Sequence, residues 1–596
     1  MLDQFSPDQV RNFAIIAHID HGKTTLTDQF LQLTNTVSSR KFIERMMDSN
    51  PIEQEKGVTI KLAPVRLFYK KYILNLIDTP GHVDFGYEVS RSLQACEGAI
   101  LLVDATQGVQ AQTLANYEKA KALNLKIIPV INKIDSPQAD LDNTVLEMIE
   151  LFGVNEEEVC FCSAKTGEGV LNILDQVIAK IPPPQNLATK NLKGLIITSK
   201  YDDHQGVVAY TRVFSGTLGK NDQLHLLFSD TSFSPIEIGI FSPEKKPVEQ
   251  LRAGEVGYVA TGLKTINQVR TGDTITHRET RKNTPPLPGY KEPTPMVFME
   301  LYPVDNGQFQ DLKDAMEKLS LHDAALVSTP THSQALGNGL RVGFLGIFHA
   351  EIVRERLDRE FDQELIATAP SVKYQIVKKN NEEITIESPA DLPDPSNIKK
   401  ILEPITKTTI FAPVEQLPMI IDFVRRRRGK LIDSINSGNR SQLNYVIPLS
   451  ELIFGFHDQL KSLSSGFASI EYEVTGYQEV DAVKVDILVN REIIEALSFI
   501  ALKEDAEERG RKLVSKLKDV VPRQMFEIPI QAAIGGKIIA RETIKAFRKD
   551  VTAKLYGGDV TRRQKLLKKQ AKGKKRMKQF GKVSLNQESF LAVLES

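Results

Sequence analysis

Cysteine is scarce in this sequence of 596 residues, and long apolar runs are missing. The three cysteines, Cys96, Cys160 and Cys162, are an odd set. Cys160 and Cys162 would point to one face of a single strand, without further partners at metal-ligand spacing. We therefore expect structural thiols in a reducing compartment. No stretch approaches the roughly 18 consecutive apolar residues that span a bilayer, which excludes an integral membrane protein.

The chain also leaves no room for a cleavable leader. Its first strand-like run begins at Asn12, soon after Met1, so we expect neither a signal peptide nor a transit peptide. The protein should therefore remain in the cytoplasm, where it is made.

Net charge is absent too, since 76 lysines and arginines balance 76 aspartates and glutamates. The balance is uneven, because every charged residue in 562–582 is basic: Arg562, Arg563, Lys565, Lys568, Lys569, Lys572, Lys574, Lys575, Arg576, Lys578 and Lys582. Such a cationic end predicts a polyanionic partner. A second run, four arginines at 425–428, suits either a solvated face or a contact with RNA.

Proline-rich seams at 182–184, 284–295 and 388–395 divide the chain. Proline favours extended structure around itself, so we interpret the seams as linkers, and the length predicts roughly three to five domains. Before the first seam, apolar runs at 13–17, 73–77, 99–103, 127–131 and 159–162 alternate with helical patterns. This alternation predicts a mostly parallel α/β sheet with functional loops at the carboxyl ends of its strands.

The remaining regions predict other kinds of structure. Short runs at 195–199, 207–214 and 255–261, punctuated by glycine, aspartate and asparagine, favour a small antiparallel β-barrel. Regions 296–380 and 400–488 each mix strands with a helix, at 308–319 and 414–426, and indicate two α+β units of ferredoxin-like type. Towards the end we predict helices at 504–517 and 541–553, and a basic stretch that orders fully only against a partner.

A phosphate-binding loop follows the first predicted strand. Residues 17–25 read Ala-His-Ile-Asp-His-Gly-Lys-Thr-Thr, with alanine in place of the usual first glycine. Backbone N–H groups converge on phosphate oxygens at a helix start only through a tight turn, which Gly22 permits. Lys23 would reach the β and γ phosphates, and the Thr24 hydroxyl would hold Mg²⁺. The predicted nucleotide-binding residues of this loop are Asp20, His21, Gly22, Lys23, Thr24 and Thr25.

Two further segments suit the phosphate side of this site. After the strand at 73–77, Asp78 would hold Mg²⁺ through water, and the Gly81 N–H would sense the γ phosphate. Thr59 would complete the metal shell only when a γ phosphate is present, which makes its segment a switch. A plain turn at Asp78 or a β-branched strand start at Thr59 would give the same residues, but neither explains all the motifs together.

The base would be recognised by segments that follow two later strands. Asn132, Lys133 and Asp135 stand in Asn-Lys-Ile-Asp, and Ser163, Ala164 and Lys165 follow the next strand. The Asp135 carboxylate can accept two hydrogen bonds from guanine, which adenine cannot donate, and Lys133 can lie along the base. The sequence therefore predicts GTP and not ATP, with strong discrimination because an unpaired carboxylate is costly.

The histidines near the loop suggest different roles. His18 and His21 with Asp20 would also suit a metal cluster, but a phosphate loop cannot give up its geometry for one. His82 follows the switch glycine where Ras-like proteins carry a water-orienting glutamine. We predict that His82, Lys23 and Gly81 form the catalytic set and that His82 positions the attacking water.

Motifs along the whole chain resemble one family. Residues 15–23, 78–85 and 132–135 are similar to the ribosome-dependent translational GTPases, including elongation factor G, BipA-like factors, tetracycline-resistance ribosome-protection proteins and LepA. The remaining motifs resemble the LepA, or elongation factor 4, family. They are Cys-Glu-Gly-Ala at 96–99, Ser-Ala-Lys-Thr-Gly at 163–167, Ile-Pro-Pro-Pro at 181–184, Gly-Phe-Leu-Gly at 343–346, and the stretches 521–528, 531–535, 556–559 and 573–578.

This resemblance implies a domain plan. It places a P-loop GTP-binding (G) domain at 1–184 and a translation-factor barrel at 190–284. Ferredoxin-like domains follow at 295–380 and 400–488, and a family-specific C-terminal domain with a basic tail at 489–596. It also implies an apolar gate of Ile19 and Val58 flanking His82, and no tRNA-mimicking domain.

The resemblance further implies a monomeric, ribosome-stimulated GTP hydrolase that uses GTP/GDP and Mg²⁺. Its partners would be the ribosome, through rRNA and ribosomal proteins, and tRNA. The activity proposed for the family is one-codon backward movement of tRNAs as a fidelity step, with ribosome assembly or initiation as rival roles. Peripheral contact with the cytoplasmic face of the membrane has also been attributed to it.

Two stretches depart from the family pattern. Residues 53–58 read Glu-Gln-Glu-Lys-Gly-Val where arginines and isoleucine are more usual, and Ala-Leu-Lys at 501–503 replaces a stretch that commonly contains His-Arg, which leaves RNA contacts near Leu502 open. A non-catalytic RNA-binding assembly factor and a BipA-like GTPase remain alternative interpretations. Intact Lys23, Thr59 and His82 favour the enzyme, and the terminal motifs favour the LepA family.

Overall fold

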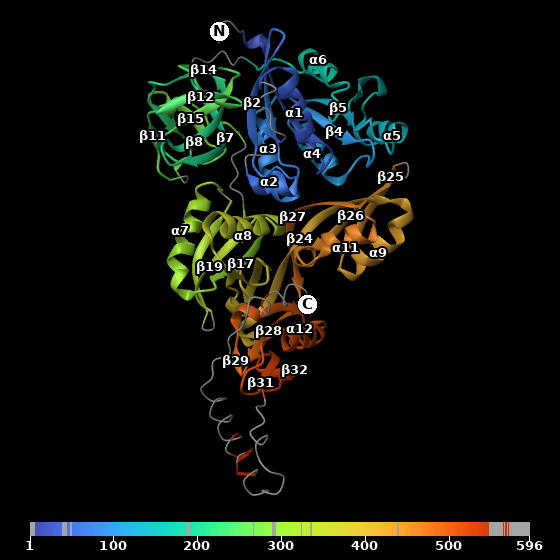
Figure 1. The fold of residues 1–596 in the computed structure, drawn as a ribbon, viewed down its shortest axis with the longest axis vertical. Helices are drawn as coiled ribbons and strands as arrows, with labels where there is room; N and C mark the ends of the chain where they lie inside the picture. The colour runs from blue at the N-terminus through green and yellow to red at the C-terminus, as the bar shows by residue number, and fades with distance from the viewer. Residues whose placement is uncertain are drawn as a thin grey trace, which may run out of the picture.

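In the computed structural model, the chain folds into successive sheet-based units (Figure 1). The structure describes residues 6–37, 45–47, 50–185, 191–265, 268–288, 294–323, 325–333, 336–437 and 440–547, and the single residues 564, 565, 567, 568, 570 and 590. The predicted combination of α/β, barrel and α+β structure is confirmed. Within the part of the chain described, no helix is long and apolar enough to cross a membrane.

A six-stranded sheet in the order β2-β3-β1-β4-β5-β6 forms the first unit. Its strands are parallel except β2, which pairs antiparallel with β3. The strands are β1 (Val10–Ala17), β2 (Ala63–Tyr69), β3 (Tyr72–Asp78), β4 (Gly98–Asp104), β5 (Lys126–Asn132) and β6 (Cys160–Phe161). The helices are α1 (Lys23–Leu33), α2 (Pro51–Lys56), α3 (Gly86–Gln94), α4 (Ala111–Ala122), α5 (Leu141–Phe152) and α6 (Val170–Lys180). The loops that carry the predicted motifs leave the carboxyl ends of β1, β3, β5 and β6.

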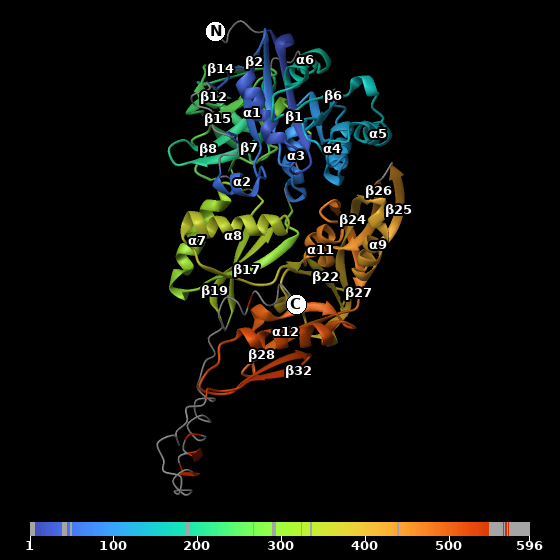
Figure 2. The same cartoon turned by 45° about the vertical axis from the view of Figure 1, so that its right-hand side comes forward.

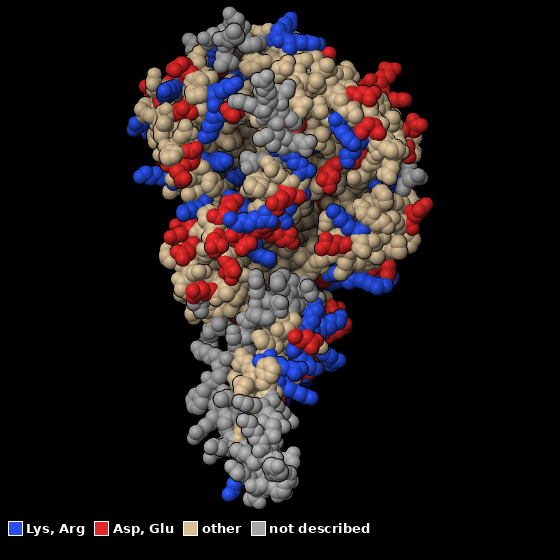
Figure 3. Space-filling model, viewed as in Figure 1, with Lys and Arg blue, Asp and Glu red and all other residues tan. Residues whose placement is uncertain are grey.

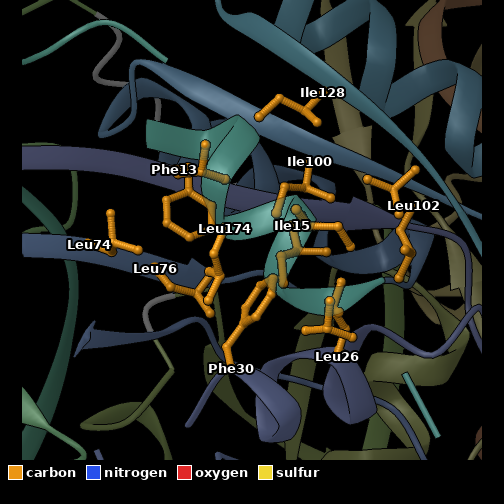
Figure 4. Packing of buried hydrophobic residues seen from close by; sticks show 14 of the residues in the cluster. Phe13, Ile15, Leu26, Phe30, Leu74, Leu76, Ile100, Leu102, Ile128 and Leu174 are labelled. Atoms are coloured by element: carbon orange, nitrogen blue, oxygen red, sulfur yellow. The ribbon is translucent and has the colours of Figure 1, made fainter. Parts of the chain in front are cut away.

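Apolar side chains cover both faces of this sheet. On one face, Phe13 and Ile15 of β1 pack with Leu26 and Phe30 of α1 and with α6 (Figure 4). The other face packs against α3, α4 and α5. Strands buried on both faces consist of continuous apolar runs, which made them recognisable in the sequence.

The cysteines lie inside this first unit. All three are free and buried. Burial raises the pKa of the Cys160 thiol, and it raises the pKa of Cys162 to about 12. No group of three His, Cys, Asp or Glu side chains gathers as a metal site in the described ranges. The thiols are therefore core residues, and the zinc interpretation of His18 and His21 gains no support.

An antiparallel eight-stranded sheet, β11-β10-β16-β7-β8-β15-β12-β13, with a small β14-β9 sheet forms the barrel unit. Its strands are β7 (Lys193–Asp202), β8 (Gly206–Ser215), β9 (Thr217–Gly219), β10 (Leu224–Leu226), β11 (Thr231–Phe233), β12 (Glu237–Ser242), β13 (Glu244–Pro247), β14 (Gln250–Arg252), β15 (Val256–Ala260) and β16 (Thr274–His277). The barrel interior is apolar.

The third and fourth units share one topology. The third comprises β17 (Val297–Pro303), α7 (Phe309–Ser320), β18 (Val327–Ser333), β19 (Gly337–Phe344), α8 (Ile347–Phe361) and β20 (Leu365–Ala367), followed by β21 (Ser371–Val372). The fourth comprises β22 (Tyr374–Lys378), β23 (Glu383–Ile386), β24 (Ile398–Pro413), α9 (Leu417–Arg426), β25 (Lys430–Ser437), β26 (Arg440–Pro448), α10 (Leu449–Leu452), α11 (Phe456–Leu463) and β27 (Ser469–Val480). The orders β18-β19-β17-β20 and β25-β26-β24-β27 are both ferredoxin-like.

The C-terminal unit packs α12 (Ala506–Val520) on β28 (Ala482–Val489), β29 (Glu492–Ile493), β30 (Phe499–Leu502), β31 (Ile528–Ile534) and β32 (Lys537–Ile544). The helix predicted at 504–517 is confirmed as α12. The helix predicted at 541–553 is wrong where it can be compared, because residues up to Ile544 form β32, paired with β31. Cross-strand pairing overrides local helical preference there. The basic run 562–582 falls almost wholly outside the described residues.

The first unit and the barrel lie side by side, the third and fourth units lie below them, and the C-terminal unit lies at the base (Figures 1 and 2). Buried Arg66 of β2 joins the first unit to the barrel through Glu255 at 3.0 Å. Asp84, Val109 and Ala111, which follow β3 and β4, contact the third and fourth units, so the carboxyl edge of the six-stranded sheet faces those units.

Candidate nucleotide-binding site

The phosphate loop turns tightly between β1 and α1. Gly22 has φ 91°, in the left-handed region, and α1 starts at Lys23. A Cβ at Gly22 would come within 2.4 Å of Asn132 Nδ2, so both the turn and the close approach require glycine. Asp20 also has a positive φ, of 61°, and is exposed. Thr24 is half-buried and Thr25 exposed in the first turn of α1.

The Lys23 ammonium contacts residues from the other motifs on the phosphate side of the site. Its Nζ lies 3.0 Å from Asp78 Oδ1, 2.9 Å from Thr59 Oγ1, and donates to the Thr79 carbonyl. The Thr79 hydroxyl donates to the Ile15 carbonyl at 2.6 Å, which anchors this segment on β1. Three motifs separated in sequence therefore meet at one ammonium group.

The same cluster fits a magnesium ion. Asp78 is fully buried. Among the described residues, the charged group that its carboxylate contacts is the Lys23 ammonium. With the Thr59 hydroxyl, the donors are hard oxygens, which Mg²⁺ prefers.

Asn132 organises the base side. Its Nδ2 donates to the His21 carbonyl at 2.9 Å, and its Oδ1 accepts from the Ala164 N–H at 2.9 Å. The side chain is almost fully buried. One amide thus joins the phosphate loop to the loops after β5 and β6, all within the first unit.

Asp135 lies exposed at the rim of this side, beside Ser163. Hydrogen bonding with Ser163 holds the pKa of the Asp135 carboxyl below its usual range, and Lys165 and Lys133 act in the same direction. Ser163 is buried and accepts from the Thr166 N–H at 3.1 Å. The carboxylate is therefore charged at neutral pH and open to a donor pair.

Asp104, at the end of β4, is a site residue that the sequence interpretation missed. Its Oδ2 lies 2.7 Å from Lys133 Nζ, and its Oδ1 accepts from the Thr106 N–H and hydroxyl at 2.8 Å each. Buried His21 accepts the Asp104 N–H at Nδ1, 3.3 Å away, and burial lowers the pKa of His21 to about 3. An aspartate directly after a buried parallel strand was the available signal.

Glu53 of α2, also missed, fastens the segment around Thr59, residues 53–60, which is the first switch. Its Oε1 accepts from the N–H groups of Ile60 and Lys61 at 2.9 and 3.2 Å. Its Oε2 accepts from the Asn50 N–H at 3.1 Å, which completes a capping box with the Asn50 side chain. Asn50-x-x-Glu53 could have been recognised as that helix-start pattern.

Gly81 and His82 belong to the segment 78–85, which is the second switch, and they contact different neighbours. An ideal Cβ on Gly81 would be 3.7 Å from the Ala17 carbonyl and from Ile19, so this backbone lies against the phosphate loop. The His82 ring instead stacks on Phe348 of α8, with centroids 4.3 Å apart and planes 23° apart. The pKa of His82 lies below its ordinary value, and burial of the ring is the main cause.

The first switch also contacts α8. Glu55 pairs with Arg359 at 2.7 Å and Lys56 with Glu355 at 3.0 Å. Basic and acidic side chains alternate over α2 and α8 on the face shown in Figure 3. These contacts involve the stretch at 53–58 that departs from the family pattern.

The four arginines at 425–428 divide into two pairs. Arg425 and Arg426 are exposed and both pair with Asp422. Arg428 pairs with Glu403 and with Glu451, and Arg427 donates to Gln459 at 3.0 Å. Internal ion pairs therefore account for Arg428, which makes it a poor candidate for contact with RNA.

Four family models match the chain. They are the elongation factor Tu GTP-binding domain at 8–183, elongation factor Tu domain 2 at 206–276, the elongation factor G C-terminus at 400–488, and the C-terminus of the GTP-binding protein LepA at 489–595.

Full-length relatives agree with these matches. Elongation factor 4 of Acetivibrio thermocellus is 50% identical over 98% of each chain. Elongation factor 4 of Thermus thermophilus is 50% identical over 99% of this chain and 98% of its own.

A crystal structure of another Thermus thermophilus protein matches in fold alone. Its TM-score is 0.56 at 18% identity, over 79% of this chain and 97% of that one. The relatives and the assembled site agree: the chain is a GTPase of the translational type and belongs to the elongation factor 4 family.

Proposed function

We propose that this chain is a ribosome-stimulated GTPase whose nucleotide state controls its binding to ribosomes. The convergence of Lys23, Thr59 and Asp78 carries this proposal, since a site that held nucleotide only for structure would not need a switch threonine at the phosphate lysine. Domains would span 1–184, 190–284, 295–380, 400–488 and 489–596.

The phosphate groups would be bound from one side of the loop. Backbone N–H groups from Asp20 to Thr25 would bind them at the start of α1, where the helix dipole also favours anions. Lys23 neutralises the β and γ phosphates, and Thr24, Thr59 and Asp78 hold Mg²⁺, the last through water. Bound Mg²⁺ supplies charge neutralisation on the phosphates.

The base and the attacking water would be recognised separately. Asp135 accepts two guanine donors, Lys133 lies along the base while Asp104 fixes its ammonium, and Asn132 holds the Ser163-Ala164-Lys165 loop in place. Gly81 senses the γ phosphate through its N–H. His82 orients water for in-line attack.

The partners follow from the family and from charge. We propose contacts with rRNA, ribosomal proteins and tRNA, in a monomeric, cytoplasmic factor that moves tRNAs backward by one codon. Ribosome assembly or initiation is the competing role for the same switch and basic end. Peripheral membrane contact remains a family expectation.

Turnover measurements test the catalytic proposal. GTP hydrolysis should rise strongly when ribosomes are added to the wild-type protein. His82→Ala should lower the stimulated rate by roughly tenfold or more with nearly unchanged GTP affinity. Equal stimulated rates in the variant and wild type would remove His82 from the chemistry.

The basic end is tested by salt. If several of its eleven cationic side chains contact phosphates, ribosome affinity falls steeply as salt rises. Deleting residues 555–596 should flatten that dependence and impair tRNA movement, while intrinsic GTP hydrolysis stays near normal. Parallel salt dependences would exclude a nucleic-acid role for this segment.

A further inference from the structure

The His82 ring is held by a residue of another unit. Phe348 lies in the first turn of α8, and its ring covers one face of the imidazole at a centroid distance of 4.3 Å. His82 Nδ1 accepts the Asp84 N–H at 3.2 Å, which fixes the ring in its plane. Stacking and this hydrogen bond together define one orientation of the histidine.

Asp84 links the same segment to two more residues. Its Oδ2 accepts the His349 N–H at 3.1 Å, and its Oδ1 accepts the Tyr472 hydroxyl of β27 at 3.4 Å. Gly346 makes this approach possible, because a Cβ there would lie 2.2 Å from the carboxyl group. The third and fourth units therefore both bind the residue that orients His82.

A hydrogen bond between His349 and Asp323 supports the turn that carries Phe348. His349 Nε2 lies 2.8 Å from Asp323 Oδ2, and His349 Nδ1 accepts the Leu345 N–H at 3.1 Å. The His349 side chain is buried and that of Asp323 is 14% exposed, and their hydrogen bond holds the start of α8 to the segment before β18. A shift of that unit would carry Phe348 with it.

From these contacts we propose that Phe348 is a positioning residue that holds His82 against α8, and that hydrolysis requires its release from this stack. The inference rests on the proposed role of His82 in orienting water. Movement of the third unit away from the second switch breaks the stack and the Asp84 contacts together. A ribosome that separates these units therefore frees His82, which gives ribosome stimulation a structural basis.

Removing the ring tests the restraint directly. Phe348→Ala should raise ribosome-independent kcat roughly threefold to tenfold, the change in population that loss of one aromatic pair permits, with GTP affinity unchanged. Phe348→Tyr keeps the ring and should retain the wild-type rate. Phe361→Ala, which removes a partly buried phenyl ring at the far end of the same helix, serves as the matched control.

A second measurement does not depend on catalysis. The histidine NMR titration should show the pKa of His82 rising towards its ordinary value in Phe348→Ala, because the ring loses its cover, and staying low in Phe348→Tyr. If loss of a phenyl ring changed the pKa of His82 merely by loosening the fold, Phe361→Ala would change that pKa equally. An unchanged kcat or an unchanged His82 pKa in folded Phe348→Ala overturns the inference.

The double variant His82→Ala with Phe348→Ala separates the proposed role of His82 in hydrolysis from the proposed positioning role of Phe348. If His82→Ala abolishes stimulated turnover and also cancels the gain in Phe348→Ala, both stand. If His82→Ala abolishes turnover but Phe348→Ala gains nothing, only the positioning role fails. If His82→Ala hydrolyses GTP normally, the proposed role of His82 fails and the positioning role fails with it.

Discussion

On the guanine side of the site, Asn132 joins backbone groups of two loops from one sheet. On the switch side, by contrast, Asp84 and Lys56 of α2 bind groups of other units. The guanine side is therefore formed within the first unit, without contacts from the other units among the described residues. The switch side takes its geometry from α8 and β27 as well as from its own segment.

This difference assigns the two halves of the site to different tasks. A half built within one sheet keeps the same base specificity however the units are arranged. A half built across units changes when those units move, as in hinge and shear transitions. Base selection should therefore be insensitive to a ribosome, and hydrolysis sensitive to one.

The largest effect should come from breaking the guanine side at Asp135. Asp135→Asn exchanges an acceptor pair for an amide, so preference should shift from GTP towards xanthosine triphosphate by roughly a thousandfold or more. Competition between the two nucleotides measures it. Asp142→Asn, in the first turn of α5 and outside the site, is the control.

Asp135→Asn also sharpens the comparison between the two halves of the site. Ribosome stimulation measured with xanthosine triphosphate should match wild-type stimulation with GTP, because the switch side is unchanged. Unaltered base preference would refute the assignment of Asp135.

The guanine side was the more predictable half because its determinants are local. Asn132 ends a buried strand, and Lys133 and Asp135 follow within three residues, so this motif was recognisable from a few consecutive residues. Continuous apolar runs likewise predicted the parallel sheet. Asp104 was missed in the sequence because it belongs to no familiar motif, although its position at the end of β4 was a signal that could have identified it.

The contacts that join the switch side to other units were not predictable in this way. Asp84 meets His349 and Tyr472, which lie 265 and 388 residues further along the chain. No local pattern encodes such partners. The wrong helix at 541–553 has the same cause, because Arg541 pairs with Gln531 across a β-ladder that local propensity does not contain.

A smaller effect should appear at His322, where the third unit meets the switch side. Burial first, then Lys61, Arg356 and Lys200, lowers the pKa of His322 to about 4. Its ordinary value is 6.5, so between these values the unfolded state binds more protons and the free energy of unfolding falls as pH falls. At about pH 5 this loss reaches at most ~2 kcal/mol.

His322→Gln should remove that term. The difference in urea midpoint between about pH 7 and pH 5 should shrink relative to wild type. His332→Gln, at an exposed position on β18, should leave the difference unchanged. An equal acid sensitivity in His322→Gln and wild type would show that protonation of His322 does not contribute to the acid sensitivity of the fold.

The smallest effect should come from the ion pair between the first switch and the third unit. Lys56 and Glu355 lie 3.0 Å apart with side chains 32% and 22% exposed, so solvent screens their attraction. Glu355 also pairs with Arg359 at 2.6 Å, which means that a single substitution at Glu355 removes two interactions. A double-mutant cycle with Lys56→Met and Glu355→Gln isolates the cross-unit pair. We expect a coupling of about 0.5 kcal/mol in the free energy of unfolding, decreasing with added salt.

The exposed pair Lys313 and Glu317, within α7 at 3.9 Å, provides a matched cycle that connects no units. Ribosome-independent turnover should rise slightly in Lys56→Met and stay at the wild-type rate in Lys313→Met, because only the first pair links a switch to α8. Additive effects at Lys56 and Glu355, with no change in turnover, would mean that the switch side is held by its other contacts, namely Asp84, Phe348 and the pair of Glu55 with Arg359.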